Sequence, residues 1–366
     1  MDKKSLIGIL IIGMVLISGC VEQRKEYPKL EIGKIGMWVN PYDEGYQNYM
    51  KALGLAREGG VQVVHYYARW SYIELKKNVY DWKISDFVID NFHKKDFEIV
   101  VVIPIIFSTT IDDLPQDLEF KNFADPLLVS RFENFLNVFL KRYMGKINYL
   151  VIGNEVDIYF AEHRDELKDF REFLLEIFDF LKENYPELKI GTEFAYHNVL
   201  KKNAEYVVKE LNIGDLTFFT LYISDEEFNF SEDIENVEKY FKGMMKISEG
   251  KRIAIVETSQ SSSEILSSSE EKQALYVKEI FRILKENRNR IEFLMWLTLH
   301  DSEPEDCKKS AEFFVRDHPE FLENVEGISR FQEFMCFLGL RNSDGSPKLV
   351  WNEWLKQVED YYEGIL

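Results

Sequence analysis

Residues 149–155 read Tyr-Leu-Val-Ile-Gly-Asn-Glu, an apolar run of strand type that ends in two polar side chains. Residues 253–257, Ile-Ala-Ile-Val-Glu, repeat this pattern further along the chain. A strand that is apolar on both faces is typical of a parallel sheet covered by helices. The two stretches therefore favour an α/β fold that places polar residues at the carboxyl ends of its strands.

The rest of the chain extends this alternation of strand and helix. Short apolar runs predict strands over 35–39, 61–67, 99–106, 149–153, 189–194, 216–221, 253–256 and 293–297. Apolar residues that recur every three or four positions predict helices that include 130–144, 165–184, 235–247 and 270–287. About eight such units in a body of this length predict a single-domain (β/α)₈ TIM barrel. An open doubly wound sheet is the alternative, but no Gly-x-Gly-x-x-Gly turn follows the first strand.

The composition excludes several classes of protein. The chain has 366 residues, of which 46% are hydrophobic, enough for a large core and too many for a disordered chain. Its 64 acidic and 45 basic residues give a net charge of -19, which repels phosphate backbones, so we expect no nucleic-acid partner. Three cysteines are too few for a disulfide scaffold, and no His-Glu-x-x-His pair occurs. We therefore expect neither a metal site nor a cofactor.

The first twenty residues have the features of an export signal. Two lysines precede an apolar run over residues 6–17, which is too short to span a bilayer comfortably. The following Ile17-Ser18-Gly19-Cys20 resembles the lipobox of prokaryotic lipoproteins, which implies cleavage before Cys20 and lipid attachment to it. We expect a signal peptide over 1–20, a polar tether over 21–32 and an exported, membrane-anchored barrel over 33–366. An uncleaved anchor with an incidental cysteine is the alternative.

Export would place the remaining cysteines in a compartment where disulfides persist. Cys307 lies in the segment 304–328, which we expect to be an insertion after the last strand, and Cys336 follows it. Their spacing in the sequence does not decide whether they meet, so a disulfide and two free thiols both stay open.

The residues that end the strands are the candidate site, because the loops after the strands of a (β/α)₈ barrel converge on one mouth. These positions carry carboxylates and aromatic rings, a combination that suggests a carbohydrate site. They include Trp38, His65, Tyr67, Arg69, Asn154, Glu155, Glu193, His197, Tyr222, Glu257 and Trp296.

Hydrolysis of a glycosidic bond requires one carboxyl group that protonates the leaving oxygen and another that faces the developing positive charge. Glu155 and Glu257 are the expected pair, because each follows an apolar strand that would hold it rigidly.

Several segments, in the same order, resemble the clan A glycoside hydrolases, which are built on the (β/α)₈ barrel. The resemblance rests on Gly153-Asn154-Glu155, Glu257-Thr258-Ser259, Arg69-Trp70-Ser71-Tyr72-Ile73-Glu74, Val79-Tyr80-Asp81-Trp82 and the segment 339–348. It implies a retaining mechanism with Glu155 as acid/base and Glu257 as nucleophile. The implied substrate is a β-linked oligo- or polysaccharide at the cell surface, cleaved without a cofactor.

The resemblance also implies roles for neighbouring residues: Tyr222 matches a tyrosine that touches the nucleophile, and Trp296 a tryptophan that forms the sugar platform. The chain departs from the pattern at the third strand end, where several relatives have histidine and this chain has Phe107 and Ser108.

Side-chain chemistry adds four further expectations. Asn154 should hydrogen-bond a sugar hydroxyl, or else serve as a turn residue. Arg69 should stabilise the anion of the nucleophile, or else form a structural ion pair. Trp38 offers a second apolar face to a sugar, and His197 should lie near the mouth. His65 should be a core histidine with its hydrogen bonds satisfied.

Two other functions stay open at this point. A barrel that has lost activity would bind carbohydrate at the cell surface or act as a cell-envelope protein, and an unrelated barrel enzyme would be a lyase or an isomerase. The sequence does not identify the sugar, the linkage, endo or exo action, or the oligomeric state.

Overall fold

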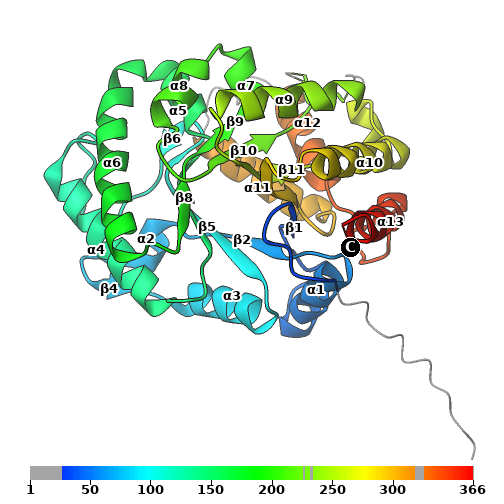
Figure 1. Cartoon of the computed structure of the whole chain (residues 1–366), viewed down its shortest axis with the longest axis horizontal. Helices are drawn as coiled ribbons and strands as arrows, with labels where there is room; N and C mark the ends of the chain where they lie inside the picture. Colours follow the sequence, from blue (N-terminus) through cyan, green and yellow to red (C-terminus); the bar gives the residue numbers. More distant parts are fainter. Residues whose placement is uncertain (1–26, 226, 231–233, 318–324, 366) are drawn as a thin grey trace, which may run out of the picture.

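The computed structural model describes residues 27–225, 227–230, 234–317 and 325–365. The expected signal peptide, the lipobox cysteine Cys20 and residues 21–26 of the expected tether lie outside the described residues. The body is a parallel barrel surrounded by helices (Figure 1).

Eight staves make up the barrel. They are β1 (Lys34–Met37), β2 (Val63–Tyr67), β5 (Glu98–Phe107), β7 (Tyr149–Asn154), β8 (Lys189–Gly191) with β9 (Glu193–Ala195), β10 (Thr217–Leu221), β11 (Ile253–Thr258) and β12 (Ile291–Trp296). The fifth stave is interrupted at Thr192, so that β8 pairs with β7 and β9 pairs with β10. The pairing runs from β8 through β7, β5, β2, β1, β12, β11 and β10 to β9, and because β8 and β9 belong to the same stave, the staves form a barrel. The predicted (β/α)₈ barrel is confirmed, and every predicted strand corresponds to one stave.

Helices between the staves cover the outside of the barrel. The longer ones are α1 (Tyr46–Glu58), α3 (Lys83–Lys94), α4 (Pro126–Arg142), α6 (Leu167–Asn184), α9 (Val237–Ile247), α10 (Glu270–Glu286) and α13 (Leu349–Glu363). The Asp125 side chain caps α4 by accepting a hydrogen bond from the Leu127 amide, and Ser269 caps α10 in the same way.

The remaining elements lie in the connections between these staves and helices. They are α2 (Trp70–Ile73), the hairpin of β3 (Glu74–Lys76) and β4 (Val79–Tyr80), β6 (Thr110–Ile111), α5 (Val156–Glu162), α7 (Tyr196–Lys201), α8 (Glu205–Leu211), α11 (Pro304–Asp317), α12 (Val325–Cys336) and three 3₁₀ turns at 164–166, 234–236 and 264–266. In the described part of the chain, no helix combines the length and apolar character needed to cross a membrane.

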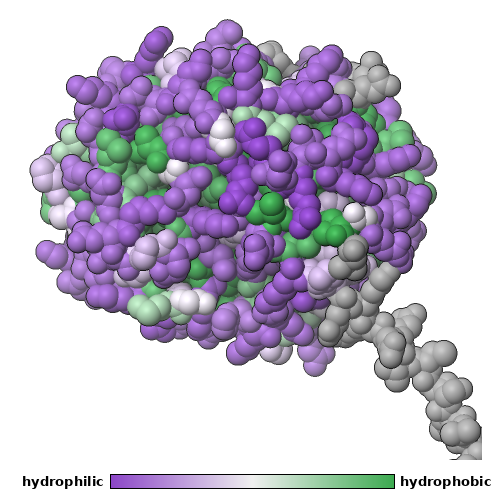
Figure 2. Space-filling view, in the orientation of Figure 1, coloured by the Kyte–Doolittle hydropathy of each residue, from purple (hydrophilic) through white to green (hydrophobic). Residues whose placement is uncertain are grey.

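The strands separate two hydrophobic layers. Val100, Val102 and Val151 belong to a cluster inside the barrel. Their neighbours Val101 and Leu150 belong to the larger cluster beneath the helices. This is the expected result of side chains that alternate between the two faces of each strand. The viewed surface is mostly hydrophilic with scattered apolar side chains (Figure 2).

A buried network of charges closes the amino-terminal end of the barrel, which we call the floor. Lys34 donates to Tyr149 at 2.8 Å, and the Tyr149 hydroxyl donates to Glu292 at 2.9 Å. Glu292 is fully buried and pairs with Lys189, which begins β8, and with Arg252, which directly precedes β11. Several staves are thus joined through one carboxylate.

We expect Glu292→Leu to lower the free energy of unfolding by about 1–3 kcal/mol, because it removes a partner of the buried Tyr149 hydroxyl and of the buried Lys34 ammonium. The measurement is the midpoint of urea-induced unfolding. Asp96→Asn is the matched control, since it removes an exposed ion pair to Lys29 that is worth at most about 1 kcal/mol. Equal effects of the two substitutions would contradict a stabilising role for the floor.

Candidate active site

Glu257 reaches the barrel mouth because its strand is irregular. Strict alternation would place Glu257 on the same face as Ile255, beneath the helices. The pairing of β11 with β10 shifts here, since Phe219 pairs with Ile255 but Thr220 pairs with Glu257. Val256 is therefore an extra residue, a β-bulge, and such a bulge re-aims the side chain that follows it.

Glu155 is positioned by its backbone conformation. It follows β7 with φ of 48°, in the left-handed region that residues other than glycine rarely adopt. Both carboxylate oxygens are held: the Ser108 hydroxyl donates to Oε2 at 2.7 Å and the Thr220 hydroxyl donates to Oε1 at 2.6 Å. Three staves therefore fix this carboxylate.

Glu257 is 8% exposed and accepts hydrogen bonds from two tyrosines. The Tyr222 hydroxyl donates to Oε2 at 2.8 Å, and the Tyr67 hydroxyl donates to Oε1 at 3.3 Å. Burial, followed by the negative charge of Glu155, raises the pKa of Glu257 to about 8, although the two hydroxyls act in the opposite direction. Glu257 therefore retains a proton near neutral pH in the absence of substrate.

The expected hydrogen bond between Tyr222 and Glu257 is thus present. The expectation for Arg69 is wrong, because its guanidinium pairs with Asp112, with Nε 3.0 Å from Oδ1. Arg69 thus forms the structural ion pair that was the alternative expectation. The groups that donate to the Glu257 carboxylate are the hydroxyls of Tyr67 and Tyr222.

The expectation that Trp296 forms a sugar platform is also wrong. Its indole is fully buried, packs against Tyr276 and Trp354, and donates from Nε1 to the Leu338 carbonyl at 3.0 Å. Met295 points into the barrel, so Trp296, one residue later, points out beneath the helices. A fully buried ring presents no face to a ligand.

Trp38 lies inside the mouth and is only partly buried. Its ring centroid is 4.7 Å from that of His65 and 5.3 Å from that of Tyr67. Neither ring nitrogen of His65 has a hydrogen-bond partner among the described residues, so the expectation of a satisfied histidine is wrong. Burial lowers the pKa of His65 to about 3, which keeps the ring neutral. A sugar contact of Trp38 stays a prediction.

Asn154 and His197 also lie next to the two carboxylates. Asn154 is 3% exposed and donates from Nδ2 to Glu193. The His197 ring lies 6.1 Å from that of Tyr222, and burial lowers its pKa while the charge of Glu155 opposes this shift. Both positions agree with the expected neighbourhood, and their contacts with a sugar stay predictions. Within the described ranges, no group of His, Cys, Asp and Glu has an arrangement that could hold a metal ion.

Sequence reasoning gave no role to Ser108, Thr220 and Glu193. Thr220 lies two residues before Tyr222, a spacing that places both side chains on the same face of one strand. Ser108 ends the third stave, where the resemblance shows a departure. Glu193 was recognised only as a polar strand end, yet it is fully buried beside Asn154.

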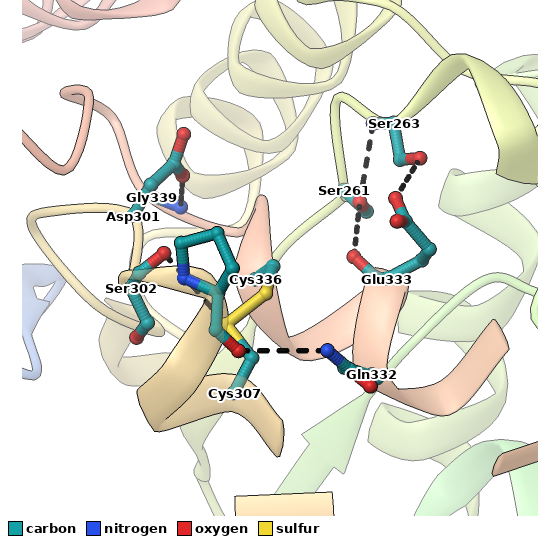
Figure 3. The surroundings of a disulfide bond; sticks show 10 residues. Ser261, Ser263, Asp301, Ser302, Cys307, Gln332, Glu333, Cys336 and Gly339 are labelled. Carbon is teal, nitrogen blue, oxygen red and sulfur yellow. Dashed lines mark hydrogen bonds between the residues drawn. A yellow bond between two sulfur atoms is a disulfide. The ribbon is translucent and has the colours of Figure 1, made fainter. Parts of the chain in front are cut away.

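The segment after β12 that carries α11 and α12 extends to Cys336, beyond the expected insertion of 304–328, and forms one wall of the mouth. A disulfide between Cys307 of α11 and Cys336 of α12 joins the two helices, with 5.5 Å between the Cα atoms (Figure 3). Ser263, in the loop after β11, donates to Glu333 of α12 at 2.7 Å. The ring of Phe334 lies 5.3 Å from that of Tyr222, so this segment supports the tyrosine that contacts Glu257. The structure therefore pairs the two cysteines that the sequence left open.

Comparison with known proteins finds similarity in three-dimensional fold. No protein-family model and no curated protein matches the chain. A GH5_18 protein from Bifidobacterium longum subsp. longum matches with a TM-score of 0.68 and 13% identity, over 91% of this chain and 80% of that one. The native xylanase 10B from Thermotoga maritima matches with a TM-score of 0.62 and 15% identity, over 91% and 97%. The exo-beta-1,4-mannosidase Op5Man5 from Opitutaceae bacterium strain TAV5 matches with a TM-score of 0.66 and 14% identity, over 93% and 62%. The chain therefore shares the TIM-barrel fold of glycoside hydrolases.

We expect Glu257→Gln to gain stability relative to the wild-type protein as the pH rises. The pKa of Glu257 is raised from 4.5 to about 8, so the native state binds this proton more tightly than the unfolded state. The wild-type protein therefore loses stability as the pH rises through this window, by an amount on the order of 2–5 kcal/mol, and the glutamine variant does not. Urea unfolding at pH 5 and pH 9 measures the difference.

Glu264→Gln, an exposed substitution in the loop after β11, is the control for this experiment. A stability difference between the wild-type protein and Glu257→Gln that is the same at both pH values would show that Glu257 carries no such shift.

Proposed function

We propose that the protein is a retaining glycoside hydrolase that cleaves β-linked oligo- or polysaccharides. The observation that carries this proposal is the pair of strand-end carboxylates at the mouth, each held by its own set of hydroxyl donors. Ser108 and Thr220 hold Glu155, while Tyr67 and Tyr222 hold Glu257. The resemblance to clan A enzymes and the shared fold support the same reading.

In this proposal the proton of the pair lies on Glu155 when substrate is bound. Glu155 donates it to the glycosidic oxygen as that bond breaks, while the Glu257 carboxylate attacks the anomeric carbon and forms a covalent glycosyl-enzyme. Glu155, now a carboxylate, accepts a proton from water, whose oxygen attacks the anomeric carbon and releases Glu257. The product keeps the anomeric configuration of the substrate.

The two tyrosines favour the nucleophilic form of Glu257. Their hydroxyls donate to the carboxylate and so stabilise the anion against the burial that favours the protonated form. The transition state adds a further stabilisation of the anion, because the positive charge that develops at the anomeric carbon as the glycosidic bond breaks attracts an ionised Glu257.

The test is hydrolysis of a panel of aryl β-glycosides and β-linked polysaccharides by the wild-type protein, Glu155→Gln and Glu257→Gln. We expect both variants to lose at least ~10²- to 10⁴-fold in kcat/KM. Glu155→Gln should retain more activity on aryl glycosides with acidic leaving groups, since these need no proton to depart. Proton NMR of the first product should show the β-anomer.

Glu264→Gln is again the control and should behave as the wild-type protein. Release of the α-anomer first would contradict retention. Carbohydrate binding without hydrolysis by the folded wild-type protein would instead support the inactive carbohydrate-binding barrel.

We also propose that the protein is exported and attached to a membrane through lipid on Cys20. The lipobox-like Ile17-Ser18-Gly19-Cys20 supports this location. The first described residue, Tyr27, stacks on Tyr362 with 4.5 Å between ring centroids, so the tether joins a fixed point on the body.

We expect the protein made in a prokaryotic host to begin at Cys20 and to carry added lipid mass there, as measured by intact mass spectrometry. Cys20→Ser should lose the lipid and retain the signal peptide. A double substitution, Cys307→Ser with Cys336→Ser, is the control and should keep the lipid. A wild-type chain without lipid would rule out the anchor.

A further inference from the structure

A third carboxyl group, Glu193, lies inside the barrel below the catalytic pair. It begins β9 and is fully buried. Its neighbour Phe194 belongs to the layer beneath the helices, so Glu193 points to the barrel interior. Oε1 accepts a hydrogen bond from Asn154 Nδ2, and Oε2 has no hydrogen-bond partner in the part of the chain that the structure describes.

The surroundings of Glu193 carry negative charge. Glu257, Glu155 and Asp157 all act on it electrostatically, in that order, and the hydroxyls of Tyr67 and Tyr222 also lie in its field. No Lys or Arg among the described residues forms an ion pair with Glu193 that would offset this charge, and its hydrogen-bond donor, Asn154, is a neutral amide. The pKa of Glu193 is raised well above its usual range, first by burial and then by the charge of these carboxylates.

We propose that Glu193 is a neutral carboxylic acid that positions Asn154 for the reaction at Glu155. The carbonyl oxygen of the acid accepts from the Asn154 amide and fixes the residue that immediately precedes the acid/base. Being uncharged, Glu193 does this without adding a further negative charge beside Glu155 and Glu257. Its effect on catalysis rests on the proposed function, whereas its protonation state and its bond to Asn154 do not.

Substitution of Glu193 by glutamine and by leucine separates the effect of its hydrogen bond with Asn154 from the effect of its charge. Glu193→Gln keeps a carbonyl oxygen that accepts from Asn154 and has no charge, so it imitates the neutral acid. Glu193→Leu keeps much of the volume and removes the acceptor, leaving the buried Asn154 amide unpartnered.

The kinetic test is the pH profile of kcat and kcat/KM for the two variants. We expect Glu193→Gln to keep kcat within about threefold and to leave both limbs of the profile in place. Glu193→Leu should lower kcat by ~10- to 100-fold with a smaller change in KM, since Asn154 and Glu155 lose their alignment. A shift of the acidic limb of Glu193→Gln to lower pH would show that the wild-type group is ionised and would overturn the proposal. Wild-type kinetics in both variants would overturn the positioning role.

Difference infrared spectroscopy tests the protonation state without any substrate. At neutral pH the wild-type protein should show a protonated-carboxyl band that Glu193→Gln lacks, and Glu257→Gln identifies the band of the neighbouring acid. Loss of an ionised-carboxylate band in Glu193→Gln would overturn the inference. If hydrolysis is never detected but the protonated band is lost as expected, only the proposed function fails. If Glu193→Leu does not fold, the glutamine variant and the spectrum still decide.

Discussion

The alternation of side chains around a closed barrel decides which residues of this protein reach the mouth. In a regular strand, Val100 and Val102 point inward and fill the barrel interior, while Val101 points outward and packs beneath the helices. The site depends on two departures from that regularity. A bulge at Val256 turns Glu257 inward, and the left-handed backbone of Glu155 ends β7 at the point where its carboxylate meets two other staves.

Buried acids have different kinds of partner at the two ends of the barrel. At the floor, Glu292 is matched by lysine and arginine side chains from the amino-terminal ends of other staves, which suits a group whose role is to hold strands together. At the mouth, Glu193 and Glu257 are met by an amide and by hydroxyls, so protons rather than cations offset their charge. An acid held in that way is poised to gain or lose a proton, which is what acid/base chemistry requires.

The sequence predicted the barrel well because each stave is a short apolar run whose signal is local. It predicted the carboxylate pair from two apolar strands that each end in a glutamate, and a resemblance in ordered motifs supported the pair. The errors have physical causes: Trp296 lies one position out of phase with the inward face, and Arg69 had a nearer partner in Asp112. Contacts between distant staves, such as Ser108 and Thr220 with Glu155, and the meeting of Cys307 with Cys336, depend on the closed three-dimensional arrangement, which no local pattern contains.

The place where the body meets its tether also fixes an orientation. Pro28 accepts a hydrogen bond from Gln62 just before β2, and Tyr27 lies on Tyr362, so the chain enters at the floor, opposite the mouth. Seven residues from Cys20 to Tyr27 reach at most about 25 Å. A lipid on Cys20 would therefore keep the floor close to the bilayer and aim the mouth at the surrounding medium. Such a geometry suits ligands that arrive from outside the cell and are too large to pass between protein and membrane.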